Sequence, residues 1–114
     1  MALIFKILHQ AAFDAIARDG IFRGATIDLD DGYIHFSTAA QVRDTARLHF
    51  SGQQGLVLFA VDDSAVQSRL RWEASRGGQI FPHVYGTVAS REILWAKPLP
   101  WDGTAHAFPP ETFL

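Results

Sequence analysis

Cysteine is absent from the 114-residue sequence, which excludes disulfide bonds, a thiolate nucleophile and a zinc site with cysteine ligands. Long hydrophobic runs are absent too, because the longest uninterrupted stretches, such as residues 56–61, fall far short of the roughly 20 residues that cross a bilayer. Residues 1–10 are interrupted by Lys6 and carry no small-residue cleavage pattern, so we expect no export signal. A cytoplasmic protein with no membrane contact is therefore predicted.

An excess of positive charge is missing as well. The net charge is −2, whereas a large nucleic-acid footprint is usually visible as a basic face. Arg69, Arg71 and Arg76 do lie close together in the sequence, which suits one small phosphorylated ligand but not a long polyanion. Hydrophobic residues at 48% and charged residues at 19% are typical of a folded globule, and the length predicts a single domain over residues 1–114.

Helices are expected early in the chain and strands mostly late, which favours an α+β fold. The helix pattern covers Gln10–Asp19, which Gly20 ends, and a second helix that a Thr38–Gln41 capping box opens and that runs to about Phe50. A short helical segment after Asp62 or Asp63 turns Val66 inward. Strands are predicted over residues 3–8, 33–36, 56–61, 71–73, 84–88 and 93–96. Residues 21–31 are expected to be turn-rich, and the tail from Pro98 to lie extended on the surface.

The segment from Asp31 to Thr38 places a histidine on a strand just before a helix N-terminus, where free backbone N–H groups attract anions. Strand alternation puts Tyr33, His35 and Ser37 on one face, and Ile34 with Phe36 on the core face. A phenol, an imidazole and a hydroxyl side by side suggest a binding surface. The alternative is that Ser37 or Thr38 only caps the helix and that His35 bonds a neighbouring carbonyl.

The segment from Arg71 to Gly86 concentrates further polar and aromatic residues. Glu73 and His83 can pair as acid and base, or the glutamate can orient the histidine. The glycines at 77 and 78 make the intervening loop suited to covering a ligand. The alternative is an ordinary β-hairpin with a surface Glu73–Arg76 ion pair, in which Trp72 and Tyr85 are core aromatics.

Close pairs of metal ligands are lacking, so a metal site would need distant residues such as His35, Glu73 and His83 to converge. We expect no resident metal. His9 is expected to be exposed, and His49 to stabilise the C-terminus of its helix.

The two polar segments together, Asp31 to Thr38 and Arg71 to Gly86, resemble a bacterial family catalogued as domain of unknown function 952. The likeness spans nearly the whole chain, from Ile4 to Ala96. The family itself resembles a minimal ADP-ribosyltransferase fold, and the stretch from Ile34 to Ser37 is similar to the Val-His-Leu-Ser strand of bacterial RNA 2′-phosphotransferases, which use NAD as acceptor. The resemblance implies a small ADP-ribosyltransferase-like domain with a mostly antiparallel curved sheet, two main helices and NAD as cofactor.

Carried over by position, the resemblance implies that His35 binds the nicotinamide–ribose part of NAD or the transferred phosphate. Those enzymes carry Tyr-His-Gly-Thr on their first strand, but here Phe5 to Leu8 stands there, so Lys6 takes the place of the ribose-binding histidine. Glu73 is the candidate for the catalytic carboxylate. The small size and the charge argue against a tRNA substrate.

Three functions remain open. The first is an NAD-dependent transferase or nucleotide-binding domain, the second a non-catalytic ligand-binding or interaction module, and the third a metal-assisted hydrolase. The candidate catalytic residues are His35, Glu73 and His83, which we expect to converge with Tyr85 on one concave surface. The candidate ligand-binding residues are Lys6, Tyr33, Ser37, Thr38, Arg71, Trp72, Arg76 and Tyr85. Trp95, in contrast, is predicted to serve the core alone.

Overall fold

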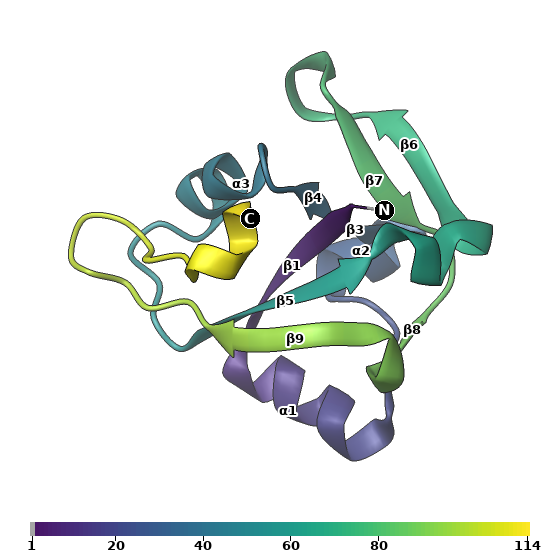
Figure 1. Cartoon of the computed structure of the whole chain (residues 1–114), viewed down its shortest axis with the longest axis horizontal. Helices are drawn as coiled ribbons and strands as arrows, with labels where there is room; N and C mark the ends of the chain where they lie inside the picture. Colours follow the sequence, from purple (N-terminus) through teal and green to yellow (C-terminus); the bar gives the residue numbers. More distant parts are fainter. Residues whose placement is uncertain (1) are drawn as a thin grey trace.

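The computed structural model describes residues 2–114, and its strands form antiparallel sheets (Figure 1). The largest sheet has the strand order β4-β1-β5-β9. Its strands are β1 (Leu3–His9), β4 (Ser37–Thr38), β5 (Leu56–Asp62) and β9 (Ile93–Pro98). The central strands β1 and β5 pair over their whole length, whereas β4 pairs only with Ile4 and Phe5. Beyond β4, the edge of β1 is therefore left open.

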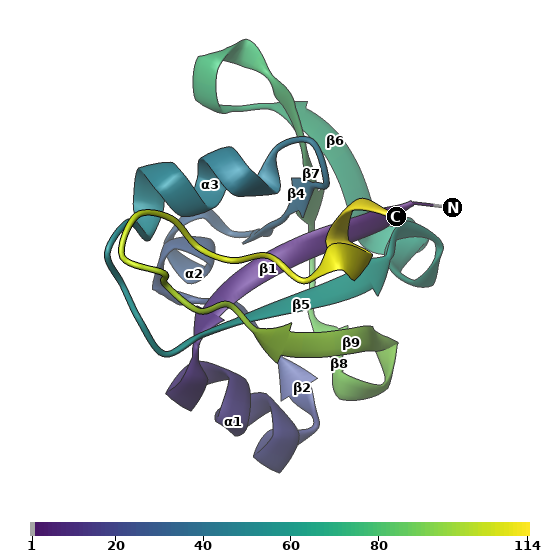
Figure 2. The ribbon, with the colours of Figure 1, turned by 60° about the vertical axis from the view of Figure 1, so that its left-hand side comes forward.

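Both faces of the central strands β1 and β5 are buried, which explains why residues 56–61 are apolar without alternation. On one face, Ile4 and Phe59 pack with Ile16 of α1 (Gln10–Asp19). On the other, Phe5 and Leu58 pack with the buried side of α3 (Val42–His49) and with the C-terminal segment. Figure 2 shows α1 and α3 on opposite sides of the sheet.

A second, three-stranded sheet has the order β3-β7-β6, and a third pairs β2 with β8. The strands are β2 (Ile21–Phe22), β3 (Ile34–His35), β6 (Leu70–Ala74), β7 (Ile80–Val84) and β8 (Val88–Ala89). The other helices are α2 (Thr26–Asp31) and the short 3-10 turns η1 (Asp63–Arg69), η2 (Arg76–Gly78), η3 (Ser90–Glu92) and η4 (Pro110–Phe113). The β6–β7 hairpin projects from the body of the molecule (Figure 1).

The predicted α+β architecture with antiparallel sheets is confirmed. The first helix occupies Gln10–Asp19 as expected, and Gly20 ends it with a φ of 77°, which favours glycine. The strands at 3–8, 56–61 and 93–96 are present and one or two residues longer. Asp62 caps η1 by accepting a hydrogen bond from the Ser64 N–H, and Val66 is fully buried.

The prediction that residues 21–31 are turn-rich is wrong. They form β2 and then α2, and the supposed turn at Gly32 is the C-cap of that helix, with a φ of 86° and its N–H bonded to the Asp28 carbonyl. The strands also form separate sheets rather than one sheet, and α2 adds to the two main helices expected.

Residues 37 and 38 do not cap α3, which begins only at Val42. The Thr38 N–H does donate to the Gln41 side chain, as in a capping box, but Thr38 lies in β4 and its carbonyl closes a turn with the Gln41 N–H. Ser37 bonds the Thr45 hydroxyl instead, at 2.8 Å. The strand register with β1 has overridden the local capping signal.

The strand predicted at 84–88 is wrong by several residues. The strand is β7, which ends at Val84, and the chain turns at Gly86 with a φ of 135°. Pro82 lies inside β7, where it has no N–H to offer but accepts a hydrogen bond from the Phe36 N–H.

The tail is not merely a surface strap, because Leu99 is fully buried and His106 bonds the Gln53 carbonyl. Trp95 is half-buried against Phe5, so it does not belong to the core alone. His9 is exposed, as expected. Among the helices of residues 2–114, none is long and apolar enough to cross a membrane.

Candidate functional site

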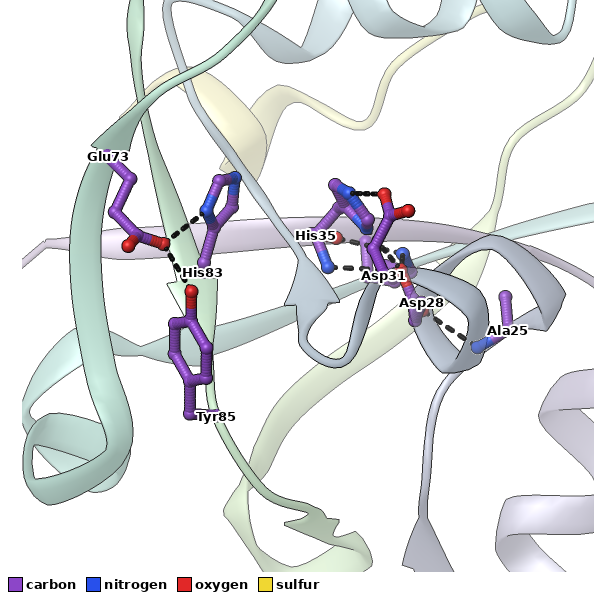
Figure 3. A network of polar contacts seen from close by, with 8 residues as sticks. Ala25, Asp28, Asp31, His35, Glu73, His83 and Tyr85 are labelled. Atoms are coloured by element: carbon purple, nitrogen blue, oxygen red, sulfur yellow. Dashed lines mark hydrogen bonds and ion pairs between the residues drawn. The ribbon is translucent and has the colours of Figure 1, made fainter.

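Asp28 holds three elements together at the open edge of β1 (Figure 3). Its carboxylate is almost fully buried. Oδ1 accepts hydrogen bonds from Lys6 Nζ at 2.9 Å and from the His35 N–H at 3.1 Å, and Oδ2 accepts from the Ala25 N–H at 2.7 Å. His35 Nδ1 lies 2.7 Å from Oδ1. Asp28 therefore links α2 to β1 and β3.

The charges of Asp28 and Lys6 depend on each other. Burial by itself opposes ionisation of Asp28, but the hydrogen bond from His35 and the charge of Lys6 outweigh it and lower the pKa to about 2. Burial lowers the pKa of Lys6, while the Asp28 charge acts in the opposite direction. Lys6 Nζ also donates to the His35 carbonyl at 2.8 Å. Such a pair is costly to break from one side, because the remaining charge stays buried.

His35 is held from two sides. Its Nε2 lies 3.0 Å from Asp31 Oδ2, at the exposed end of α2, while its Nδ1 faces Asp28. A ring with carboxylates at both nitrogens is suited to donating from both. The ring is 28% exposed, so its position is fixed without its being fully covered.

A second polar group comes from the β6–β7 hairpin. Glu73 Oε1 accepts a hydrogen bond from the Tyr85 hydroxyl at 2.8 Å and lies 2.8 Å from His83 Nδ1. The hydrogen bonds of His83 and Tyr85 lower the pKa of Glu73, and the one with Glu73 raises the pKa of Tyr85. Because the glutamate only accepts, Nδ1 of His83 carries the proton. Glu73 therefore orients the histidine, which was one of the two pairings that the sequence allowed.

The other ring nitrogen of His83 has no partner. His83 is 2% exposed, and within residues 2–114 its Nε2 makes no hydrogen bond. Figure 3 shows this nitrogen on the side of the ring away from Glu73. Tyr33 stacks on the ring with centroids 4.2 Å apart, which fixes the ring plane.

Strand register explains how residues far apart in sequence meet. His35 lies opposite His83 in the β3–β7 pair, and Arg71 lies opposite His83 in the β6–β7 pair. Alternation then puts Glu73 and Tyr85 on the same face as the two histidines. The two imidazole rings are 5.4 Å apart. The predicted proximity of His35, Glu73, His83 and Tyr85 is confirmed, but only the two histidines line the cavity described next.

A cavity of about 500 Å³ opens beside the two histidines, where β4 leaves the edge of β1 uncovered. Its size is ordinary for a small-molecule site. The lining mixes aromatic and basic side chains: Phe5, Lys6, Ile7, Ile27, Asp31, His35, Phe36, Ser37, Val42, Thr45, His49, Phe50, Ser75, Arg76, Phe81 and His83. Glu73, Tyr85 and Tyr33 are not among the residues that line it.

Arg76 provides the cavity with a guanidinium. Its carbon lies 4.8 Å from the centre of the Phe81 ring, and its nitrogens lie 3.4 Å from His49 Nε2 and 3.5 Å from the Thr45 hydroxyl. Among the described lining residues, Lys6 is paired with Asp28 and Asp31 faces His35, which leaves the Arg76 guanidinium as the charged group available to a ligand. This end of the cavity therefore favours an anionic ligand.

Several residues predicted for the site lie elsewhere. Trp72 is on the opposite face of the hairpin from Glu73, because it pairs with Pro82, and it is 47% exposed. The three arginines do not grip one ligand: Arg69 is bound by Glu92, and Arg71 stacks over Tyr85 outside the cavity. Thr38 does not line the cavity, and Ser37 reaches it with a hydroxyl already bonded to Thr45.

Sequence reasoning missed Asp28 and Asp31 as site residues and gave His49 only a helix-end role. A signal for α2 was available, since Asp31-Gly32 also reads as a helix terminus with glycine at the C-cap. Nothing in the local sequence marks Asp28 as buried, because its partners come from distant positions. Among residues 2–114, no group of three or more histidines and carboxylates is placed to hold a metal ion.

Comparison with known proteins identifies a family and similar solved structures. The profile of a family described as protein of unknown function (DUF952) matches residues 7–96. The crystal structure of protein CC0527 from Caulobacter crescentus is similar, with 40% identity and a TM-score of 0.92 over 98% of this chain and 99% of that one. The solution NMR structure of CC0527 is 42% identical, with a TM-score of 0.84 over 93% of this chain and 91% of that one. No curated protein matches the sequence.

Proposed function

Because the chain belongs to the DUF952 family of proteins of unknown function, we propose a function from the geometry of the site: the cavity binds a compact phosphorylated nucleotide, NAD or a close relative of it. The observation that carries the proposal is Arg76 beside His49 at the wall of a cavity lined with aromatic rings. A guanidinium presents paired N–H donors that match phosphate oxygens. Aromatic and aliphatic side chains such as Phe36 and Phe81 suit the flat face of a base or nicotinamide ring.

More specifically, we propose that the domain acts in the way of the ADP-ribosyltransferases that its sequence resembles. In that case NAD is the donor substrate, and the residues near the sugar are His35 and His83, with Glu73 acting through His83. Release of nicotinamide from NAD, absent in the Glu73→Gln variant, would identify an enzyme, and transfer of the ADP-ribosyl group to an acceptor other than water would identify a transferase. Binding without release would identify a non-catalytic ligand-binding module.

Thermal unfolding with added ligand tests the binding. A ligand at 100 times its dissociation constant adds about 2.7 kcal/mol, which raises the melting temperature of a domain of this size by about 10 °C or more. We expect NAD and ADP-ribose to produce such a shift and adenosine, which has no phosphate, to produce much less.

Matched arginine variants locate the contact. Arg76→Ala should remove most of the shift, whereas Arg18→Ala, the same change on the exposed face of α1, should leave it intact. The proposal is contradicted if neither nucleotide raises the melting temperature at millimolar concentration, or if both variants respond as the parent protein does.

A further inference from the structure

His83 lines the cavity, and its buried Nε2, which has no hydrogen-bond partner within residues 2–114, is a feature that the binding of a phosphate leaves unexplained. We infer that His83 is a specificity-determining residue, which accepts a hydrogen bond from a hydroxyl or amide N–H of the ligand. The inference deepens the proposed function, on which it rests, by assigning the non-phosphate end of the ligand. The ligand class is then a phosphorylated ribosyl compound with a free sugar hydroxyl or carboxamide.

The direction of this hydrogen bond follows from Glu73. Its Oε1 lies 2.8 Å from Nδ1, and a carboxylate can only accept, so Nδ1 keeps the proton and Nε2 is the nitrogen that can offer a lone pair. The Tyr85 hydroxyl holds the same oxygen from the other side, and Tyr33 stacks on the ring. Glu73, Tyr85 and Tyr33 are thus positioning residues for a fixed acceptor.

A fixed, buried acceptor without a hydrogen-bond partner is unfavourable. Nitrogen and oxygen atoms in protein interiors are nearly always hydrogen-bonded, and a buried one that is not forfeits the bond it made to water. Nε2 is covered by its neighbours, with less than 1 Å² accessible, so the ligand has to turn aside a side chain of the cavity wall to reach it. A ligand donor recovers the missing bond, and a second acceptor at that place would be repelled.

Two ligands, two variants and a control variant separate this contact from the phosphate contact. ADP-ribose has phosphates and sugar hydroxyls, whereas inorganic pyrophosphate has phosphates alone. By calorimetry, we expect His83→Phe to raise the dissociation constant of ADP-ribose about tenfold, which is the value of one hydrogen bond, and to leave that of pyrophosphate unchanged. Arg76→Ala should weaken the binding of both ligands. Trp72→Phe, an aromatic replacement on the opposite face of the hairpin, should change neither by more than about twofold.

The ring nitrogens provide a test that needs no variant. In nitrogen-15 spectra of the wild-type protein, we expect a protonated Nδ1 and an unprotonated Nε2 for His83, and ADP-ribose should shift the Nε2 resonance in the direction of an accepted hydrogen bond. If ADP-ribose binds and His83→Phe binds it equally well, or if Nε2 carries the proton in the free protein, the inference is wrong and the proposed function stands. If the wild-type protein binds neither ligand, both fall together.

Discussion

The Lys6–Asp28 pair gives the sharpest test of how the site is held together. Asp28 is 1% exposed in its side chain and accepts hydrogen bonds from Lys6 and from the His35 backbone. Asp28→Asn leaves the Lys6 ammonium buried without its counter-charge. Breaking a buried pair from one side typically costs about 3–5 kcal/mol, a large part of the 5–15 kcal/mol by which domains of this kind are stable.

The pKa of Asp28 shows independently how much the ionised carboxylate stabilises the fold and in which direction this stability changes with pH. It falls from its ordinary value of 3.8 to about 2 in the folded protein, which corresponds to about 2 kcal/mol of stability. Because the folded-state pKa is depressed, this stability is fully present above pH 4 and is lost as the pH falls from about 4 to about 2. Asp28→Asn should lack this part of the acid dependence.

Urea unfolding of a double-mutant cycle measures the coupling. We expect Asp28→Asn to cost at least 3 kcal/mol in the parent protein, and about 2 kcal/mol less in a Lys6→Met background, where no charge is left unpaired. An equal cost of Asp28→Asn in both backgrounds, or a cost below about 1 kcal/mol in the parent, would show that Lys6 and Asp28 are not coupled in this way.

Three further changes have expected outcomes. Phe59→Ala should cost about 3–5 kcal/mol by urea unfolding, because Phe59 is fully buried; a cost below about 1 kcal/mol would show a looser core. Gly24→Ala should lower the melting temperature, because a Cβ there would lie 2.9 Å from Asp28 Cβ at a φ of 125°; an unchanged melt would contradict this. Tyr85→Phe should raise the pKa of Glu73, measured by carboxyl NMR, since it removes a hydrogen bond; an unchanged pKa would show that the bond is not formed in solution.

The parts of the fold that follow from the sequence are those with a local signal. The apolar run at residues 56–61, the helix Gln10–Asp19 with Gly20 behind it, and the polar–apolar alternation around His35 each specify their own structure. The pairing of Glu73 with His83 also has a local basis, because a short hairpin returns the chain on itself and brings the two side chains to one face.

What the sequence does not reveal depends on distant partners. Asp28 looks like one of several aspartates in a solvated turn, and only Lys6, 22 residues away, makes it a buried ion pair. The proline at 82 argues locally against a strand, yet the Phe36 N–H uses its carbonyl and β7 runs through it. The cavity arises because β4 is too short to cover β1, which is a property of the sheet rather than of any segment.

A backbone amide NMR titration of the wild-type protein with ADP-ribose tests the central claim most directly. The account predicts saturable shifts confined to the elements around the cavity, with the largest near Arg76 and His83 and none along the exposed face of α1. An unchanged spectrum at millimolar ligand, or shifts that gather away from these residues, would contradict it.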